Sequence, residues 1–429
     1  MLRVLSITSN PEALIAAYAR VSRSKKNGTE RLKEAIYDKE ETRKTIRSIL
    51  ECGHDNILES VNMTIELEGS RLCLRDILLN RLISPIEMSQ RYVQIDKNFF
   101  HMPKEIKKNN RAEQLFKEDL QLKIEAYYEF YERLKSYFIQ KGKDEKVASG
   151  LAKEDARYFL SNSTKSRIVV NANLRSWLDI LVELEASASE EHSAFSKKLE
   201  EVIKENFPTV YKSKIKSNLQ KNNTQKNNIE YNLPKLTESE YDFKVKLIDY
   251  LIPSTMLKPS IKSKRKDELV IFQYSLAMSQ SAVRQYLRHR MQSLIITEEN
   301  ITDYALPASF AETGLEKKAR DLFTKINANI KEAFGINPVI ARYMLTNAHK
   351  VRMLTSLNLR ELSKISSLRE CLKAQWEIRS IVKEMTKKAS QLDPTFKAKF
   401  GPRCVQLGFC PEGENSCHEF EAIKKEYML

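Results

Sequence analysis

Hydrogen-bond donors concentrate in ten consecutive residues, 284–293, with the sequence RQYLRHRMQS. Residues three and four apart meet on a helix surface. A helix continuing from 271–283, which holds no Pro or Gly, would therefore bring Arg284, Gln285 and Arg288 onto neighbouring faces. Arginine side chains match the planar geometry of phosphate and carbonyl groups better than lysine side chains do. The segment is thus a candidate anion-binding site, and the alternative is a solvated basic helix end.

Length and composition restrict the class of protein. The 429 residues are enough for two domains, and 41% hydrophobic and 30% charged residues are typical of a soluble globular chain. No apolar run approaches the roughly 20 residues that cross a bilayer, and no signal peptide is visible, so we expect no membrane association and a cytoplasmic location. The six cysteines are too few for a disulfide scaffold and are expected to be reduced.

The formal charge of +15 favours an anionic partner, which is either a nucleic acid or a phosphorylated metabolite. The basic residues are scattered among acidic ones, and no RRM, KH or zinc-finger signature is present. We therefore expect no nucleic-acid partner.

Helix-period patterning with few Gly and Pro predicts an α+β, mainly α fold. Strands are predicted at 3–8 and 61–67, and Pro85 is expected to force an irregular loop. Helical patterns are found at 42–51, 70–82, 112–160, 172–206, 268–288, 315–333, 338–356 and 358–390.

Two pairs of segments repeat at one offset. Residues 156–160 (ARYFL) return as 341–345 (ARYML), and residues 173–175 (NLR) return as 358–360, both 185 residues later (341 minus 156 and 358 minus 173). This spacing predicts a tandem duplication whose copies pack as a pseudo-dimer, each with long helices and a small antiparallel sheet. The expected parts are a first copy at 1–212, a linker at 213–235, a second copy at 236–400 and a Cys-containing tail at 401–429.

The repeated motifs resemble those of the flavin-dependent thymidylate synthases (ThyX), with the family patterns RHRxxSxNxxSxRY, GHxSxxEH, ARxxLP and NLRSWxxFLxLRxxxxAQWEIR. In the first half the matching residues are 19–22 (ARVS), 53–59 (GHDNILE), 84–92 (SPIEMSQRY), 156–157 (AR) and 173–177 (NLRSW). In the second half they are 284–285 (RQ), 288–290 (RHR), Ser293, 341–342 (AR), 358–360 (NLR), 368–369 (LR) and 374–379 (AQWEIR).

The departures from these patterns are complementary. In the first half RHR has become 79–81 (LNR), and Leu184 stands in place of the second arginine of the late helix. In the second half RHR and Arg369 are present, but S-x-R-Y has become 298–301 (EENI) and GHxSxxEH is absent, with Ser263 near the position of its histidine. ThyX sites are assembled between subunits, so the two halves together would complete one composite site. Arg81 and Arg342 are then expected to be relics held by ion pairs.

The resemblance implies reductive methylation of dUMP to dTMP with methylenetetrahydrofolate, NADPH and FAD. It assigns the nucleotide phosphate to Ser89, Arg91 and Arg157, further nucleotide contacts to Gln285 and Arg288, and polarisation of the uracil edge, the catalytic role, to Arg369. It places six residues around the flavin: His54, Glu87, His289, Arg290, Asn358 and Arg360. It also implies self-association through the ThyX-like domains. No cysteine in the matched segments stands where a nucleophile is needed.

Two alternatives stay open. Divergence in both halves also describes a catalytically weak or inactive flavin- or nucleotide-binding relative, although drift has no reason to spare complementary sets of arginines. In the tail, Cys404, Cys410, Cys417 and His418 could bind zinc, but their spacing lacks the C-x₂-C pattern, and a packed tail without metal is the preferred reading.

Overall fold

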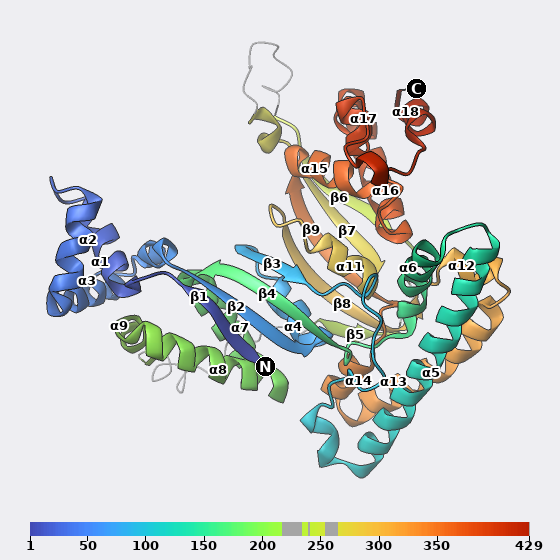
Figure 1. The fold of residues 1–429 in the computed structure, drawn as a ribbon, viewed down its shortest axis with the longest axis horizontal. Helices are drawn as coiled ribbons and strands as arrows, with labels where there is room; N and C mark the ends of the chain where they lie inside the picture. The colour runs from blue at the N-terminus through green and yellow to red at the C-terminus, as the bar shows by residue number, and fades with distance from the viewer. Residues whose placement is uncertain (217–233, 239–240, 254–264, 429) are drawn as a thin grey trace. The chain divides into compact units, whose positions relative to one another are not determined.

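The structure is a computed structural model that describes residues 1–216, 234–238, 241–253 and 265–428 (Figure 1). Most of the predicted linker and Ser263 lie outside the described residues. The chain forms two compact units. Unit 1 comprises Met1–Ser89, Ile95–Gln114 and the described residues of Asn162–Asn232. Unit 2 comprises Gln90–Gln94, Leu115–Ser161 and the described residues of Leu233–Leu429. Two segments of the first repeat, Gln90–Gln94 and Leu115–Ser161, therefore belong to unit 2.

Unit 1 is built on an antiparallel sheet with the strand order β1-β2-β4-β3. Its strands are β1 (Leu2–Ile7), β2 (Asn62–Ser70), β3 (Ile83–Glu87) and β4 (Lys165–Asn173). Its helices are α1 (Pro11–Val21), α2 (Gly28–Tyr37), α3 (Lys39–Glu51), α4 (Arg71–Leu78), α7 (Leu174–Ala186), α8 (Glu190–Asn206) and α9 (Pro208–Val210). Helices α1, α2 and α3 pack together as a cluster that follows β1 in the chain (Figure 1).

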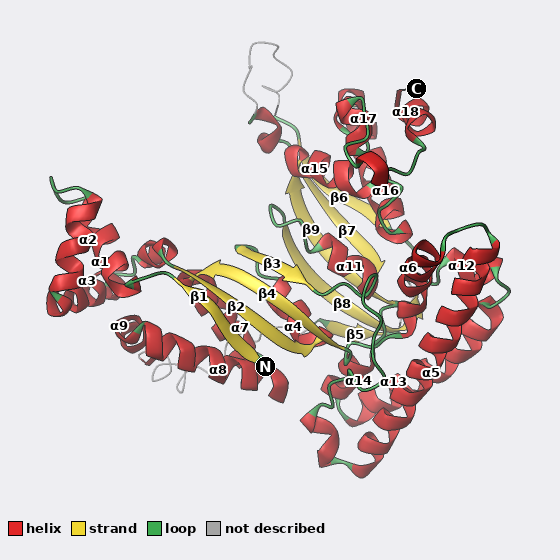
Figure 2. Cartoon of the chain, in the orientation of Figure 1, coloured by secondary structure: helices red, strands yellow, loops and turns green. Residues whose placement is uncertain are grey.

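Unit 2 holds a sheet with the strand order β5-β8-β9-β7-β6, in which only the β5–β8 pair is parallel (Figure 2). Its strands are β5 (Lys235–Thr237), β6 (Val245–Leu251), β7 (Ile271–Ser279), β8 (Ser293–Tyr304) and β9 (His349–Asn358). Its helices are α6 (Glu145–Ala156), α11 (Gln280–Tyr286), α12 (Ala308–Glu312), α13 (Glu316–Ile336), α14 (Pro338–Met344), α15 (Leu359–Arg369), α16 (Trp376–Leu392), α17 (Arg403–Leu407) and α18 (Phe420–Met428). Helix α5 (Asn110–Gln140) begins in unit 1, and most of its length belongs to unit 2.

The duplication is visible in the topology. The order β6-β7-β9-β8 in unit 2 repeats β1-β2-β4-β3 of unit 1, with β5 added beside β8. The helix caps repeat as well: Asn173 accepts a hydrogen bond from the Ser176 N–H (2.9 Å), and Asn358 accepts one from the Glu361 N–H (2.8 Å). The prediction of a mainly α fold with two small sheets is confirmed; the pseudo-dimer packing stays a prediction.

Three local predictions are wrong. Residues 271–279 form strand β7 and not a helix, because this run is buried along nearly its whole length at the centre of the sheet and so lacks an alternating pattern. The helix predicted at 338–356 ends at Met344, and most of its second half pairs as β9. Pro85 lies within β3 and not in an irregular loop. The edge position of β3 explains this, since the missing N–H of a proline is tolerated there.

A buried carboxylate joins the two repeats inside unit 2. Glu377, at the start of α16, accepts hydrogen bonds from the Ser279 N–H (2.8 Å), from the Ser279 hydroxyl and from the Tyr158 hydroxyl (2.9 Å). Ser279 ends β7 and caps α11, and Gln375 Nε2 also donates to the Tyr158 hydroxyl (2.6 Å). Three separate segments are thereby held around one charge that is removed from water.

None of the described helices combines the length and the apolar character needed to cross a membrane.

We predict that Glu377→Ala lowers the free energy of unfolding by about 3 kcal/mol, because it leaves two hydroxyls and one backbone N–H buried without their acceptor. Glu377→Gln, which keeps one acceptor oxygen and the volume, is expected to cost less. Urea unfolding followed by circular dichroism measures both variants. Glu384→Ala on the same helix, which loses only a 3.7 Å pair with Lys388, is the control. Equal losses at the two positions would contradict a structural role for Glu377.

Candidate functional site

The donor-rich segment 284–293 begins in the short helix α11, which directly follows β7, and continues beyond the end of that helix. The Ser279 side chain accepts a hydrogen bond from the Ala282 N–H, which starts the helix, and the helix ends at Tyr286. Gln285 is therefore in the helix, whereas Arg288, His289 and Arg290 follow it. The Gln285 side chain is only 8% exposed, and its Nε2 donor has no partner among the described residues. A buried donor without a partner is costly, and a ligand would satisfy it.

Arg369, the last residue of α15, is held by the same segment. Its Nε donates to His289 Nε2 (2.9 Å), and its Nη2 donates to the Gln285 carbonyl (2.9 Å). Burial, together with the nearby charges of Arg369, Lys364 and Arg288, lowers the pKa of His289 to about 3. The imidazole is therefore neutral and accepts the bond. Arg369 is thus oriented before any ligand arrives.

Two motif arginines, one from each repeat, line the same cavity of unit 2. Burial lowers the pKa of Arg369 to about 10, and the positive charges of Arg288 and Arg91 contribute to the same shift. Arg91 and Arg369 line this cavity of about 430 Å³, together with Tyr92 and Lys373. Arg91 donates to the Lys373 carbonyl (3.4 Å) across this cavity wall. The site is therefore strongly electropositive and partly removed from water.

Arg157 joins the cluster through Glu154. The Glu154 carboxylate forms an ion pair with Arg91, and its backbone carbonyl accepts a hydrogen bond from Arg157 Nε (3.0 Å). Arg157 is 6% exposed, and its Nη2 has no hydrogen-bond partner within the described part of the chain. Its carbonyl accepts from Asn347 Nδ2 (2.8 Å), which fixes the backbone. The sequence analysis did not select Glu154, although an acidic residue three positions before Arg157 on a predicted helix could have indicated an interaction.

The remaining sequence-predicted residues are not gathered in the same way. Ser89 ends the first segment of unit 1, two residues before Arg91. Glu87 is also in unit 1 and pairs with Arg71 (3.3 Å). In unit 2, Asn358 caps α15, and the exposed Arg360 forms an ion pair with Glu268. Arg290 is exposed at the end of the donor-rich segment.

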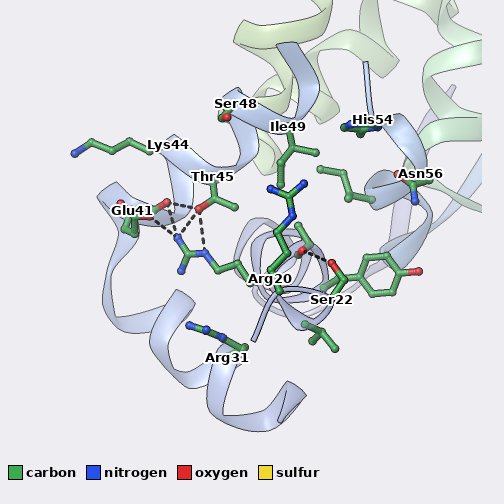
Figure 3. A pocket seen from close by; sticks show the side chains of 15 residues that line it. Arg20, Ser22, Arg31, Glu41, Lys44, Thr45, Ser48, Ile49, His54 and Asn56 are labelled. Carbon is green, nitrogen blue, oxygen red and sulfur yellow. Dashed lines mark hydrogen bonds and ion pairs between the residues drawn. The ribbon is translucent and has the colours of Figure 1, made fainter. Parts of the chain in front are cut away.

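His54 lines a second cavity, of about 830 Å³, which belongs to unit 1 alone (Figure 3). The wall carries cationic side chains from α1, α2 and α3. Arg20 donates to Thr45 (3.0 Å) and pairs with Glu41 (2.9 Å), and Arg31 pairs with Glu34 (2.9 Å). The His54 side chain is labelled beside Asn56 on the opposite part of this wall (Figure 3). Such a cavity suits an anionic ligand.

The family description "Thymidylate synthase complementing protein" (Thy1) matches residues 3–209 and again residues 210–395. The chain belongs to this family. The double match confirms the resemblance to ThyX and agrees with the tandem duplication.

Individual relatives that the chain matches are described as flavin-dependent thymidylate synthases. The flavin-dependent thymidylate synthase of Pyrococcus abyssi is 34% identical over 170 residues, which are 34% of this chain and 67% of the relative. That of Clostridium tetani is 30% identical over 178 residues, which are 41% of this chain and 71% of the relative. A solved structure of a UMP/dUMP methylase from Streptomyces cacaoi bound with 5-Br dUMP aligns at a TM-score of 0.37 with 20% identity, over 50% of this chain and 93% of that one, too weakly to support an argument.

The counterpart positions of the ThyX motifs carry internal partners. Arg342, which repeats Arg157, forms a buried ion pair with Glu299 (3.3 Å), as expected of a relic. Leu184, at the position that repeats Arg369, is buried and apolar. Asp76, at the position that repeats Gln285, accepts hydrogen bonds from Arg75 (2.8 Å) and lies 3.1 Å from His192 Nε2. Among the described residues, the motif arginines Arg91, Arg157 and Arg369 all lie in unit 2, and two of them, Arg91 and Arg369, line one cavity.

The tail places cysteines at the 430 Å³ cavity. Cys404, Cys410 and Cys417 line it together with Cys371, which follows α15. Among the described residues, however, no group of three or more His, Cys, Asp or Glu side chains is arranged to hold a metal ion. The zinc alternative therefore gains no support from the geometry.

The neutral His289 makes stability depend on pH. Its pKa is about 3 in the folded chain and about 6.5 when unfolded, so between these values only the unfolded state binds the proton. The free energy of unfolding should therefore fall as the pH falls from 6.5 toward 3, by up to about 1.4 kcal/mol per pH unit for this group. We predict that the stability difference between wild type and His289→Asn shrinks between pH 7 and pH 4.5 in urea titrations.

The difference between variants is the proper measure, because burial raises the pKa of Asp155 to about 7 and acts in the opposite direction. Gln292→Ala is the control: this neighbour is buried and hydrogen-bonded to Thr355 (2.9 Å) but does not titrate. A His289 difference as constant with pH as the Gln292 difference would show that the imidazole is not held neutral.

Proposed function

We propose that this chain is a flavin-dependent thymidylate synthase that converts dUMP to dTMP, with one active site per chain, built in unit 2 from both repeats. The observation that carries the proposal is that Arg91 of the first repeat and Arg369 of the second line one cavity of unit 2. Two further cationic side chains and a single carboxylate line the same cavity, so an anion would be attracted there. A nucleoside monophosphate provides that anion.

The phosphate dianion fits the side of the cluster that Arg91 and Arg157 form. Arg91 is oriented by Glu154, and the buried Nη2 of Arg157 is a donor without a partner among the described residues. Arginine forks bind phosphate with two parallel hydrogen bonds, which also fix its orientation. Ser89 remains the predicted third contact.

The uracil ring fits the side that Arg369 and Gln285 form. Methylene transfer requires C5 of the ring to act as a nucleophile, and negative charge then develops on the ring oxygens. Arg369 would stabilise this charge, and its bonds to His289 and to the Gln285 carbonyl hold it in place beforehand. A group that does not have to reorganise contributes most to catalysis. A C–C bond would then form between C5 and the methylene carbon, the C–N bond from that carbon to the folate would break with tetrahydrofolate as the leaving group, and the C5 proton would be lost.

FAD fits the donor set of the chain. In unit 2, Arg290 is exposed beyond the end of α11, Asn358 caps α15, and Arg360 lies in the first turn of α15 and pairs with Glu268. The resemblance assigns these residues and His289 to the flavin. In unit 1, the cavity with His54 carries cationic side chains that suit an anionic ligand, and His54 and Glu87 stay predicted flavin contacts. When bound, FAD supplies the hydride that turns the methylene into a methyl group, with NADPH as the source of electrons.

The second set of positions is proposed to be inactive. Glu299 places a carboxylate on Arg342, where the working set would hold the phosphate, and Leu184 has no donor for a uracil edge. Self-association of chains through these domains stays a prediction.

Arg369→Ala is predicted to reduce dTMP formation by 10²–10³-fold, roughly the 3–4 kcal/mol of one interaction with developing charge. The assay supplies dUMP, methylenetetrahydrofolate and NADPH and measures dTMP by chromatography, with bound flavin checked by absorbance. Leu184→Met, a substitution that keeps the volume at the counterpart position, is expected to change the rate little. Equal sensitivity at both positions would refute the asymmetric site.

Flavin is predicted to bind as one FAD per chain and not two. The reason is that each repeat has lost a different part of the flavin motifs, at Asn80 in the first and in the missing GHxSxxEH segment of the second. FAD released by denaturation is counted by its absorbance against the protein concentration. Two FAD per chain would show that both sets of positions work, and none would leave the reading of an inactive relative.

A further inference from the structure

The C-terminal segment 401–428, called the tail here, is anchored beside Arg369. The Gly401 N–H donates to Ser366 Oγ (2.7 Å), and the Tyr427 hydroxyl donates to Glu370 Oε2 (2.6 Å). Ser366 and Glu370 flank Arg369 at the end of α15 and are hydrogen-bonded to each other (3.0 Å). The tail lies beyond residue 395, where the second family match ends.

Gly401 sets the direction of the tail. Its φ of +117° is a conformation that residues with a side chain rarely adopt, and a Cβ there would stand 2.9 Å from the Tyr427 ring. The start and the end of the tail are therefore packed against each other as well as against α15. Because both ends of the tail are anchored, the segment between them can form a stable wall of a cavity.

Residues of the tail line the 430 Å³ cavity together with the motif arginines Arg91 and Arg369. Four cationic side chains and one carboxylate line this cavity: Arg91, Arg369, Lys373 and Arg403, and Glu412. Arg403 opens α17, is exposed, and makes no side-chain hydrogen bond or ion pair within the part of the chain that the structure describes. The cavity thus has more positive charge than one carboxylate balances, and Arg403 is a cation still available to a ligand.

Building on the proposed function, we propose that the tail is a wall of the substrate cavity and that Arg403 binds an anionic oxygen group of a substrate. That group is either the phosphate of the nucleotide or a carboxylate of the folate. Both fit a guanidinium fork, and the exposure of Arg403 suits a group that enters from solvent. Arg403 would then act as a specificity-determining residue outside the part of the chain that the family description matches.

The first test measures binding with Arg403→Ala, Arg403→Lys and, as the matched control, Lys425→Ala, an exposed cation of the tail outside the cavity lining. If Arg403 holds the phosphate, Arg403→Ala weakens dUMP binding about three- to tenfold in calorimetry and leaves deoxyuridine binding unchanged. If it holds a folate carboxylate, dUMP binding is unchanged and the KM for methylenetetrahydrofolate rises by a similar factor. Arg403→Lys should recover part of either loss.

The second test uses the thiols of the wall. Cys410 and Cys417 line the cavity and are half-buried, whereas Cys52 is exposed in unit 1 and serves as the internal reference. Saturating dUMP and folate should slow alkylation of Cys410 and Cys417 by iodoacetamide at least several-fold, relative to Cys52, when the modified peptides are quantified by mass spectrometry.

The inference is overturned if Arg403→Ala changes neither affinity, if Lys425→Ala has the same effect, or if both substrates bind without protecting Cys410 and Cys417. These results would leave the proposed function standing. A wild-type protein that fails to bind dUMP at all would instead refute the proposed function, and the inference with it.

Discussion

The buried carboxylate of Glu377 holds separate elements of unit 2 together. Glu377 is buried, and every hydrogen bond that compensates its charge comes from a different part of the chain than α16 itself. The Tyr158 hydroxyl brings the segment that carries Arg157, and Ser279 brings the junction of β7 and α11 that leads to Gln285 and Arg288. Loss of any donor would leave charge uncompensated in a medium of low dielectric constant. The elements that present the arginines are therefore held by one requirement, the need to satisfy a single buried anion.

The sequence indicated the candidate site residues more reliably than it indicated the helices and strands. The helix predicted at 315–333 and the strand predicted at 61–67 agree with α13 and β2, because both are amphipathic with clear periods. The run 271–279 misled, because its neighbours on both sides bury it and erase the period. For the site, the resemblance to ThyX selected Arg91, Arg288 and Arg369, and of these Arg91 and Arg369 line one cavity. It could not reveal the contact of Arg91 with Glu154, 63 residues away, or the approach of Arg403, since neither depends on local pattern.

The two repeats differ in how a buried motif arginine is compensated. An arginine left in a buried position after its ligand is lost would be an uncompensated charge. At Arg342 this charge is met by Glu299, which is fully buried, and the pair adds a hydrogen bond from Gln280 to the same carboxylate (3.4 Å). At Arg157 no carboxylate is bonded directly to the guanidinium among the described residues, and its Nη2 stays open. Arg342 and Arg157 thus differ in whether the chain supplies a carboxylate to the guanidinium.

The position of Arg91 within unit 2 has a consequence for concentration. In a site shared by separate chains, the two sets of arginines meet only as often as the chains associate, and dilution empties the site. Here a covalent chain carries Arg91 and Arg369 into one compact unit, so their encounter is intramolecular and their effective concentration does not depend on how much protein is present. The duplication would in this way convert an assembly equilibrium into a folding equilibrium, and the site would persist at protein levels where a dimer falls apart.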